Sequence, residues 1–344
     1  MKKIKIGIIG ATGYSGEALL SILLRHPNAA VEIITSKTYA GQKISQVYPH
    51  LTGITDLVCT EPDMHKLSKM DVVFLALPHG LSVEPVKALV KAGVVAIDIG
   101  ADFRFRDAAD YKTWYGAKHL APELCKSAVY GLPEIHAAQI KTAKVIANPG
   151  CYATASILAL YPLLKKKLVK KDSIVIDAKS GVSGAGRGLT LGTHYTECNE
   201  AIAAYKVAEH RHTGEIEQEI ESKVTFVPHL TPMDRGILAV CYADAAAALK
   251  KPGFLSSLEL AYKEVYRGAK FIRLFKDTLP STKYVRGTNF CDIAVKYDRR
   301  TGKVIVISAI DNLIKGAAGQ AVQNMNLRFN LPESTGLDLV NVYP

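Results

Sequence analysis

Hydrophobic residues in the first 150 positions form short, nearly continuous runs that alternate with segments of helical spacing. The runs are KIKIGIIG, VEIITS, VVFLAL, VVAIDI and KVIANPG, and amphipathic segments such as YSGEALLSILLRH and LSVEPVKALVKAG lie between them. Runs without polar alternation are typical of parallel strands that helices cover on both faces. The pattern therefore predicts a doubly wound parallel sheet of the Rossmann type over residues 1–150.

The pattern changes after this point and predicts an α+β domain over residues 151–312. CYATASILALYPLL predicts a helix that begins after Gly150 and ends near Pro162, and SIVIDAKSG, VTFVPHL, GILAVCYADA and FIRLF predict strands. NFCDIAVKYDRRTGKVIVISAID alternates on both sides of Arg-Thr-Gly, which predicts an antiparallel hairpin. The segment 313–344 contains a helix rich in small residues, and we expect it to return to the first domain.

Composition places the chain among ordinary globular proteins. Hydrophobic residues make up 48% and charged residues 22% of its 344 positions, and no apolar run is long enough for a membrane helix. The apolar start is interrupted by Lys5 and leads into a glycine turn, so it predicts a strand rather than a signal peptide, and we expect a cytoplasmic protein. The six cysteines are scattered without a CxxC pair, which argues against disulfides and against a metal site.

The formal net charge of +11 raises the possibility of nucleic-acid binding. The basic residues are spread along the chain, however, and the one tight run, KKKLVKK (165–171), fits an exposed turn. We therefore expect no nucleic-acid partner. A general positive field suits small anionic substrates, which it would steer toward the protein.

A glycine-rich loop, GIIGATGYSG, joins the first strand to the first helix. Gly10, Gly13 and Gly16, with Thr12, Tyr14 and Ser15 between them, predict a site where backbone N–H groups meet a dinucleotide pyrophosphate. The alternative is a tight turn without a ligand. The second strand ends in Thr35, Ser36 and Lys37 rather than in an acid that would hold a ribose 2′-OH, so Ser36 and Lys37 favour NADP over NAD.

Cys151 follows Asn-Pro-Gly at the expected start of a helix. Unpaired N–H groups at a helix start stabilise a thiolate and lower a cysteine pKa, which makes covalent catalysis available. A buried packing cysteine is the alternative. The candidate bases are His210 and His212, which precede Thr213, a plausible N-cap, and Glu215 in the first helical turn. Solvent-facing histidines at a helix start are the alternative there, and spacing alone does not pair either one with Cys151.

Two further segments offer anion-binding groups at the ends of predicted strands. KSGVSGAGRG (179–188) contains Ser183 between glycines, and GADFRF (100–105) presents Arg104, a natural partner for a carboxylate or phosphate. Ordinary loop residues are an equal alternative in each segment.

Together these motifs resemble the N-acetyl-gamma-glutamyl-phosphate reductases, the arginine-biosynthesis branch of the semialdehyde dehydrogenase superfamily. The resemblance covers essentially the whole chain. It rests on nine collinear motifs: GATGYSGEALLSILLRHP, LPHGLS, ADFRFRD, YGLPE, NPGCYATA, GVSGAGR, HRHTGEIE, PHLTPMDRGI and DNLIKGAAGQAVQNMN.

The resemblance implies that NADPH reduces an acyl phosphate through a thioester on Cys151, with release of phosphate and formation of N-acetylglutamate 5-semialdehyde. It implies His210 as the acid/base, with His212 the less favoured choice. The other implied site residues are Pro78, His79, Gly80 and Asn312 toward the nucleotide, and Arg104, Asn148, Ser183, Glu215 and Arg235 toward the substrate.

One departure and two alternatives accompany the resemblance. Gly214 stands where the family commonly has proline before the glutamate, which loosens the helix start without removing chemistry. The alternatives are a lysine-pathway reductase of an aminoadipyl phosphate, free or attached to an acidic carrier protein, and a catalytically silent NADP-binding regulator. The resemblance also implies a homodimer or homotetramer built on the second half of the chain.

Overall fold

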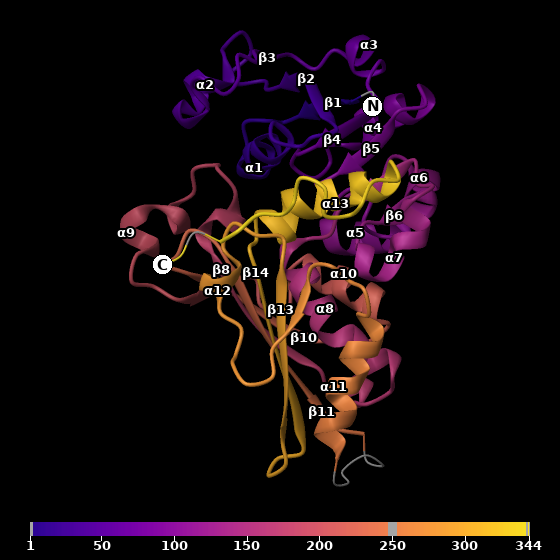
Figure 1. Ribbon diagram of the computed structural model, residues 1–344, viewed down its shortest axis with the longest axis vertical. Coiled ribbons are helices and arrows are strands. Elements are labelled where there is room, and N and C mark those ends of the chain that lie inside the picture. Colours follow the sequence, from indigo (N-terminus) through magenta and orange to yellow (C-terminus); the bar gives the residue numbers. More distant parts are fainter. Residues whose placement is uncertain (1–2, 247–252, 342, 344) are drawn as a thin grey trace. The chain divides into compact units, whose positions relative to one another are not determined.

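The computed structural model describes residues 3–246, 253–341 and 343 (Figure 1). The chain divides into two compact units. Unit 1 comprises Met1–Pro149 and Ala317–Leu339, and unit 2 comprises Gly150–Gly316 and Val340–Pro344. Residues 313–316 and 340–344, which we grouped with the returning helix, thus lie in unit 2.

Unit 1 is built on a seven-stranded sheet in the order β3-β2-β1-β4-β5-β7-β6. Every neighbouring pair in this sheet is parallel, which confirms the doubly wound architecture. The central strands β1, β4 and β5 are buried almost throughout, as their unbroken apolar runs predict. The strands are β1 (Ile4–Ile9), β2 (Ala29–Thr35), β3 (Cys59–Thr60), β4 (Val72–Leu75), β5 (Val95–Asp98), β6 (Val129–Tyr130) and β7 (Val145–Ala147).

The helices of unit 1 connect these strands, and a last one arrives from the end of the chain. Helix α13 (Gly319–Arg328) packs against α1 and α7. Its buried side chains include amides that bind backbone carbonyls; Gln320 and Asn324, for example, both donate to the carbonyl of Gly131, at 2.9 and 2.8 Å. The other helices are α1 (Tyr14–Leu23), α2 (Ile44–Val47), η1 (Pro49–Leu51), α3 (Met64–Leu67), α4 (Val83–Lys91), α5 (Ala108–Tyr115), α6 (Pro122–Ser127) and α7 (Pro133–Ile140).

Unit 2 contains a second seven-stranded sheet, in the order β12-β13-β14-β11-β8-β10-β9. It is mixed: β8 pairs parallel with β10 and antiparallel with β11, and β13 and β14 form the predicted antiparallel hairpin. Buried and half-buried residues alternate along β11, so one face of the sheet is covered more fully than the other. The strands are β8 (Val175–Gly181), β9 (Ala203–Ala204), β10 (Thr225–Thr231), β11 (Ile237–Asp244), β12 (Ile272–Leu274), β13 (Cys291–Asp298) and β14 (Lys303–Ile310).

Helix α8 (Cys151–Lys165) packs against β11 and β14, and α10 and α11 pack against α8. The remaining helical segments of this part of the chain are η2 (Lys171–Ser173), η3 (Val182–Ala185), η4 (Leu191–Thr193), α9 (Tyr195–Cys198), α10 (His212–Ile220), α11 (Phe254–Val265), α12 (Thr282–Val285) and a π-helix (Ile314–Ala318). Among the described residues, no helix is both long enough and apolar enough to cross a bilayer.

The prediction that the helix after Gly150 ends near Pro162 is wrong, because this helix, α8, continues to Lys165. Proline has no N–H, so the carbonyl of Leu158 loses its partner within the helix. The hydroxyl of Tyr266 donates to that carbonyl at 2.6 Å, and Tyr262 donates to the neighbouring carbonyl of Ala159. Tyr266, at the end of α11, therefore supplies from outside the helix the hydrogen bond that Pro162 cannot make.

Candidate active site

Cys151 is the first residue of α8, directly after the N-cap Gly150, and its side chain is partly exposed. The π-helix passes close to it: a Cβ added to Gly316 would lie 2.7 Å from the Cβ of Cys151. Such a contact is too short for any real side chain, so only glycine fits at position 316. Cys151 thus lies between the start of α8 and the backbone of Gly316.

The ring of His212 lies against Gly150. A Cβ added to Gly150 would lie 2.3 Å from Nε2 of His212, so the imidazole occupies the space that a side chain at position 150 would fill. The buried carboxylate of Glu215 accepts a hydrogen bond from the Gly150 N–H at 2.7 Å. The beginning of α10 therefore contributes two groups to the residue that precedes Cys151.

His210 is enclosed by aromatic rings instead. Its ring lies edge-on to those of Tyr152, Tyr205 and Phe226, and only 9% of the residue is exposed. Nδ1 accepts the backbone N–H of His212 at 3.1 Å, so in the neutral ring the proton is on Nε2 and is donated to the Tyr205 hydroxyl at 3.3 Å. Sequence reasoning did not identify these aromatic partners: Tyr152 lies in the quoted motif NPGCYATA, and Tyr205 and Phe226 lie in none of the nine motifs.

The chain of donors continues away from His210. Tyr205 donates to the Tyr152 hydroxyl at 3.4 Å, and Tyr152 donates to the carbonyl of His229 at 2.8 Å. Burial, together with the neighbouring His212, lowers the pKa of His210 to about 2. Burial also raises the pKa of Tyr205 to about 12. All members of the chain are therefore neutral at physiological pH.

The start of α10 differs from the prediction. Thr213 was expected at the N-cap, but the helix begins at His212 with Arg211 in the capping position, and no side chain caps it. Thr213 is buried inside the first turn. Glu215 lies in the first turn as predicted, and its bond to Gly150 explains why the chain approaches α8 here.

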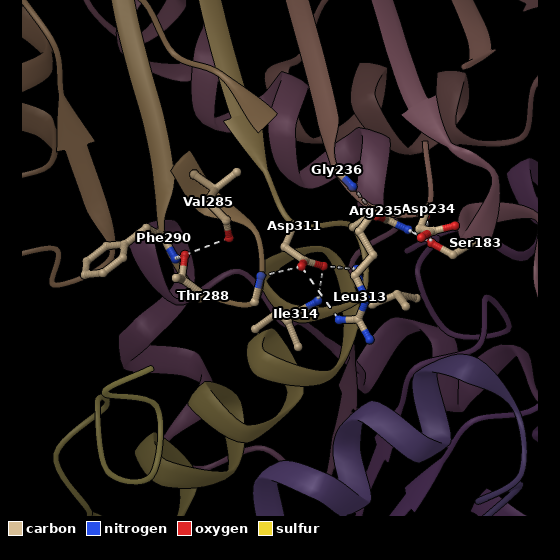
Figure 2. A network of polar contacts seen from close by, with 12 residues as sticks. Ser183, Asp234, Arg235, Gly236, Val285, Thr288, Phe290, Asp311, Leu313 and Ile314 are labelled. Carbon is tan, nitrogen blue, oxygen red and sulfur yellow. Dashed lines mark hydrogen bonds and ion pairs between the residues drawn. The ribbon is translucent and has the colours of Figure 1, made fainter. Parts of the chain in front are cut away.

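A second cluster contains Ser183, Arg235 and Asp311 (Figure 2). Asn312 belongs to it through its bonds to Gly236 and Ser183. The fully buried carboxylate of Asp311 accepts the N–H groups of Leu313 and Ile314 at 2.8 and 3.1 Å, and it also accepts the N–H of Gly287 at 2.7 Å. Its other contact is with the guanidinium of Arg235, at 3.7 Å. Asp311 was not predicted, although it is the first residue of the quoted motif DNLIKGAAGQAVQNMN.

Asn312 ties this cluster together. Its side-chain oxygen accepts the Gly236 N–H at 2.7 Å, and its NH₂ group donates to the Ser183 hydroxyl at 2.9 Å. Ser183 in turn donates to the carbonyl of Asp234. Asn312, expected near the nicotinamide, thus positions the loop that carries Ser183.

In unit 1, the predicted glycine loop is packed as closely as glycine permits. Gly10 has φ of +86°, and a Cβ there would lie 2.4 Å from the Ala76 carbonyl oxygen. A Cβ at Gly16 would lie 2.3 Å from the oxygen of Gly10. Gly13 caps α1 without any side-chain hydrogen bond, so the helix presents its first N–H groups as a pyrophosphate site requires. These residues fit a dinucleotide.

The end of β2 is also formed as the sequence suggests. The hydroxyls of Thr12 and Ser36 lie 2.9 Å apart, and Ser36 accepts the Tyr39 N–H at 3.3 Å. Ser36 is buried, whereas Lys37 is exposed. The loop that follows β4 exposes Pro78, His79 and Gly80.

Arg104 and Asn148 lie inside unit 1. The buried guanidinium of Arg104 donates to the carbonyls of Asn148 and Ile99, at 2.9 and 3.1 Å. The side chain of Asn148 is fully buried; it donates to the Ala317 carbonyl and accepts from Asn324, each at 3.1 Å. Both residues therefore fix the Asn-Pro-Gly turn that leads into Cys151.

No group of three or more histidine, cysteine, aspartate and glutamate side chains gathers as metal ligands in the described part of the chain. Comparison with known proteins identifies two family domains. Residues 5–143 match the semialdehyde dehydrogenase NAD binding domain, and residues 151–312 match the semialdehyde dehydrogenase dimerisation domain.

Relatives match along nearly the full length of the chain. N-acetyl-gamma-glutamyl-phosphate reductases from Pelotomaculum thermopropionicum and Desulforudis audaxviator are each 51% identical; both alignments cover 99% of this chain and 99% and 100% of the relatives. Among solved structures, aspartate semialdehyde dehydrogenase II from Vibrio cholerae, complexed with ASA, shares the fold, with a TM-score of 0.72 at 18% identity and coverage of 96% of this chain and 99% of that one. The chain therefore belongs to the semialdehyde dehydrogenase family, within its N-acetyl-gamma-glutamyl-phosphate reductase branch.

Proposed function

We propose that the chain catalyses the NADPH-dependent reduction of N-acetylglutamyl 5-phosphate to N-acetylglutamate 5-semialdehyde and phosphate, a step of arginine biosynthesis. The observation that carries this proposal is the placement of Cys151 at the first position of α8, with the His212 ring against the preceding glycine. A thiolate at a helix start is stabilised by the N-terminal N–H groups and the helix dipole.

The sulfur of Cys151 attacks the acyl carbon, the bond from that carbon to the phosphate oxygen breaks, and phosphate leaves. The product is a thioester on Cys151, which divides a difficult displacement into two easier steps. NADPH held at the glycine loop of Gly10, Gly13 and Gly16 would supply the hydride for the thioester carbon. Collapse of the resulting adduct breaks the C–S bond, releases the aldehyde and returns the thiolate.

We assign proton transfer at this site to His212 rather than to His210. His210 uses Nδ1 to accept a backbone N–H and Nε2 to reach Tyr205, and it is buried. His212 is more exposed and lies beside the residue that precedes the nucleophile. His210 then acts by fixing the backbone of His212. General acid–base groups contribute about 10²–10⁴-fold, so His212→Asn should lower kcat far more than His210→Asn.

Anionic groups of the substrate would be handled within unit 2 by Arg235 and the loop of Ser183. The fully buried Asp311 holds the guanidinium of Arg235 at one side, while 30% of the arginine side chain stays exposed. An arginine oriented in this way can receive a carboxylate or phosphate without losing its fixed position. Glu215 fixes Gly150, and Arg104 fixes the turn before it, so both act on the substrate through Cys151.

NADP is the expected nucleotide because the end of β2 carries no carboxylate. Gly10, Gly13 and Gly16 would receive the pyrophosphate, and Ser36 with Lys37 would accept the 2′-phosphate that an acid would repel. The six cysteines form no disulfide. We also propose a cytoplasmic location, which the biosynthetic family of the relatives supports.

We also propose that a second copy of the chain covers the half-buried face of the unit 2 sheet. Val240 of β11 lies opposite Ile307 of β14, and Tyr242 lies opposite Ile305; all four residues are half-buried. An apolar sheet face of this kind is a usual interface in homodimers. Sedimentation of the wild type and of Val240→Lys tests this, since a charge in such an interface should release monomers.

The test of the reaction is its reverse. NADP⁺ reduction is measured with N-acetylglutamate 5-semialdehyde, with and without inorganic phosphate, in the wild type, in Cys151→Ser and in the control Cys198→Ser, which changes another partly exposed thiol. Turnover that needs phosphate and disappears only in Cys151→Ser supports the proposal. Turnover with the aminoadipyl analogue alone would assign the chain to the lysine pathway, and NADP binding without turnover would make it a regulator.

A further inference from the structure

The loop after β4 is exposed at its tip but anchored at its end. Leu81 is 52% exposed, whereas Ser82 is fully buried at the start of α4. Gly80 has φ of +84°, a conformation that favours glycine. The tip carries Pro78, His79 and Gly80, which face solvent. Something other than apolar packing must hold this loop in one shape.

The anchor is the carboxylate of Asp102, which is fully buried. Oδ1 accepts the N–H of Gly80 at 2.6 Å, and Oδ2 accepts the N–H of Ser82 at 2.9 Å. One carboxylate therefore holds two N–H groups of the same loop from a position 20 residues further along the chain. Bonds from N–H to an ionised carboxylate are stronger than those between neutral groups.

Two tyrosines, Tyr111 and Tyr115, further stabilise the position of Asp102 and of the loop. The Tyr111 hydroxyl donates to Oδ1 at 3.0 Å, and Tyr111 stacks on Tyr115 with ring centroids 4.7 Å apart. The ring of Tyr115 contacts His79 at the loop tip, 5.5 Å between centroids. The same network thus touches the loop at its tip and at its end.

A second buried carboxylate supports the loop at Ser82. The Ser82 hydroxyl donates to Oδ1 of Asp98 at 2.8 Å, and Asp98 also accepts the Asp102 N–H at 3.2 Å. Two neighbouring buried carboxylates are unfavourable for stability: burial and the charge of Asp102 raise the pKa of Asp98 to about 6. A turn that only connected a strand to a helix would not need such a pair.

We propose that Asp102 is a positioning residue for the nucleotide, which sets the 78–82 loop before NADPH binds. The inference rests on the proposed function in taking the nucleotide to bind at the carboxyl edge of the unit 1 sheet, where this loop follows β4 beside the glycine loop that follows β1. A loop held in its bound shape loses less conformational entropy when the ligand arrives, so the carboxylate raises affinity without touching the ligand.

The test substitutes Asp102→Asn and measures NADPH affinity by fluorescence titration, together with hydrogen exchange of the Gly80 and Ser82 amides in the nucleotide-free protein. The new NH₂ group opposes one of the two loop N–H groups, so we expect faster exchange at both amides and a dissociation constant about tenfold higher. The KM for NADPH should rise likewise, with kcat changed less than threefold. Asp292→Asn is the control, because Asp292 is a buried carboxylate of unit 2 paired with Arg273.

Faster exchange with unchanged NADPH affinity would overturn the proposal, because the loop would then not serve the nucleotide. An equal loss of affinity in the Asp292→Asn control would also overturn it, since the effect would reflect general destabilisation. Because NADPH binding is measured without the acyl phosphate, the proposal survives or fails independently of the substrate assignment.

A pair of milder variants serves if Asp102→Asn does not fold. Ser82→Ala removes a hydroxyl that holds the loop to Asp98, and the control Thr113→Ala removes an exposed hydroxyl that donates to the Ala109 carbonyl of its own helix. We expect a roughly threefold weaker NADPH affinity in the first and no change in the second. Equal affinities in both variants would refute the positioning role.

Discussion

Replacing His210 by asparagine should make the protein less sensitive to acid. The folded protein holds this ring neutral, because its Nδ1 accepts the His212 N–H and burial lowers its pKa to about 2. The unfolded chain binds a proton on the same histidine below its ordinary pKa of about 6.5. A lowered folded pKa gives stability that is fully present above about pH 6.5 and is lost as the pH falls toward 2.

Over most of this pH range, the size of the loss in stability depends only on how far the unfolded chain is protonated. At pH 5.0 the unfolded histidine is almost fully protonated, whereas the folded one, with a pKa of about 2, is not. Proton binding therefore favours unfolding by about 2 kcal/mol at pH 5.0, against less than about 0.1 kcal/mol at pH 7.5. Asparagine can still accept the His212 N–H through its side-chain oxygen but does not titrate.

The assay is urea unfolding at pH 7.5 and pH 5.0 for the wild type, His210→Asn and the control His65→Asn. His65 is exposed, so its removal takes away an imidazole without changing a buried contact. We expect the free energy of unfolding to fall by about 2 kcal/mol more in the wild type and in the control than in His210→Asn. An equal fall in all three would show that the folded protein protonates His210, and the assignment of proton transfer to His212 would lose its basis.

Three other changes test separate parts of the site. Gly316→Ala places a methyl group 2.7 Å from the Cβ of Cys151 and displaces the cysteine, so kcat and the rate of Cys151 alkylation should each fall about 10²-fold. The control Gly188→Ala should change neither rate, because a methyl group there meets nothing within 4 Å. Ser36→Asp should shift the ratio of kcat/KM for NADPH and NADH toward NADH, and an unchanged ratio would show that Ser36 does not read the 2′-phosphate. Tyr266→Phe should lower the free energy of unfolding by about 1–3 kcal/mol, because the Leu158 carbonyl loses its donor at Pro162; a neutral result in urea unfolding would contradict this account of α8.

The parts of the fold that sequence reasoning predicted are those fixed by local patterns. The unbroken apolar runs of β1, β4 and β5 and the alternation around the β13–β14 turn each specify an element within ten residues or so. The end of α8 could not be predicted in this way, because Tyr266 lies 108 residues from the carbonyl that it satisfies. Tertiary partners overrode the usual effect of proline, which acts only through the local backbone.

The same distinction explains what was missed in the site. His210 and His212 stand two residues apart with similar local sequence, and only the fold separates them: one ring enters an aromatic enclosure and the other meets Gly150. Asp102 stands in a quoted motif beside Arg104, yet its role depends on loop amides 20 and 22 residues away. A motif names residues that matter together, but which of them reacts and which holds another in place is decided by burial and by the hydrogen bonds already formed. In this chain both ring nitrogens of His210 already form hydrogen bonds, and we therefore assign proton transfer to His212, which His210 positions. The carboxylate of Asp102 likewise already accepts hydrogen bonds from the protein, so it acts on the nucleotide through the loop that it positions.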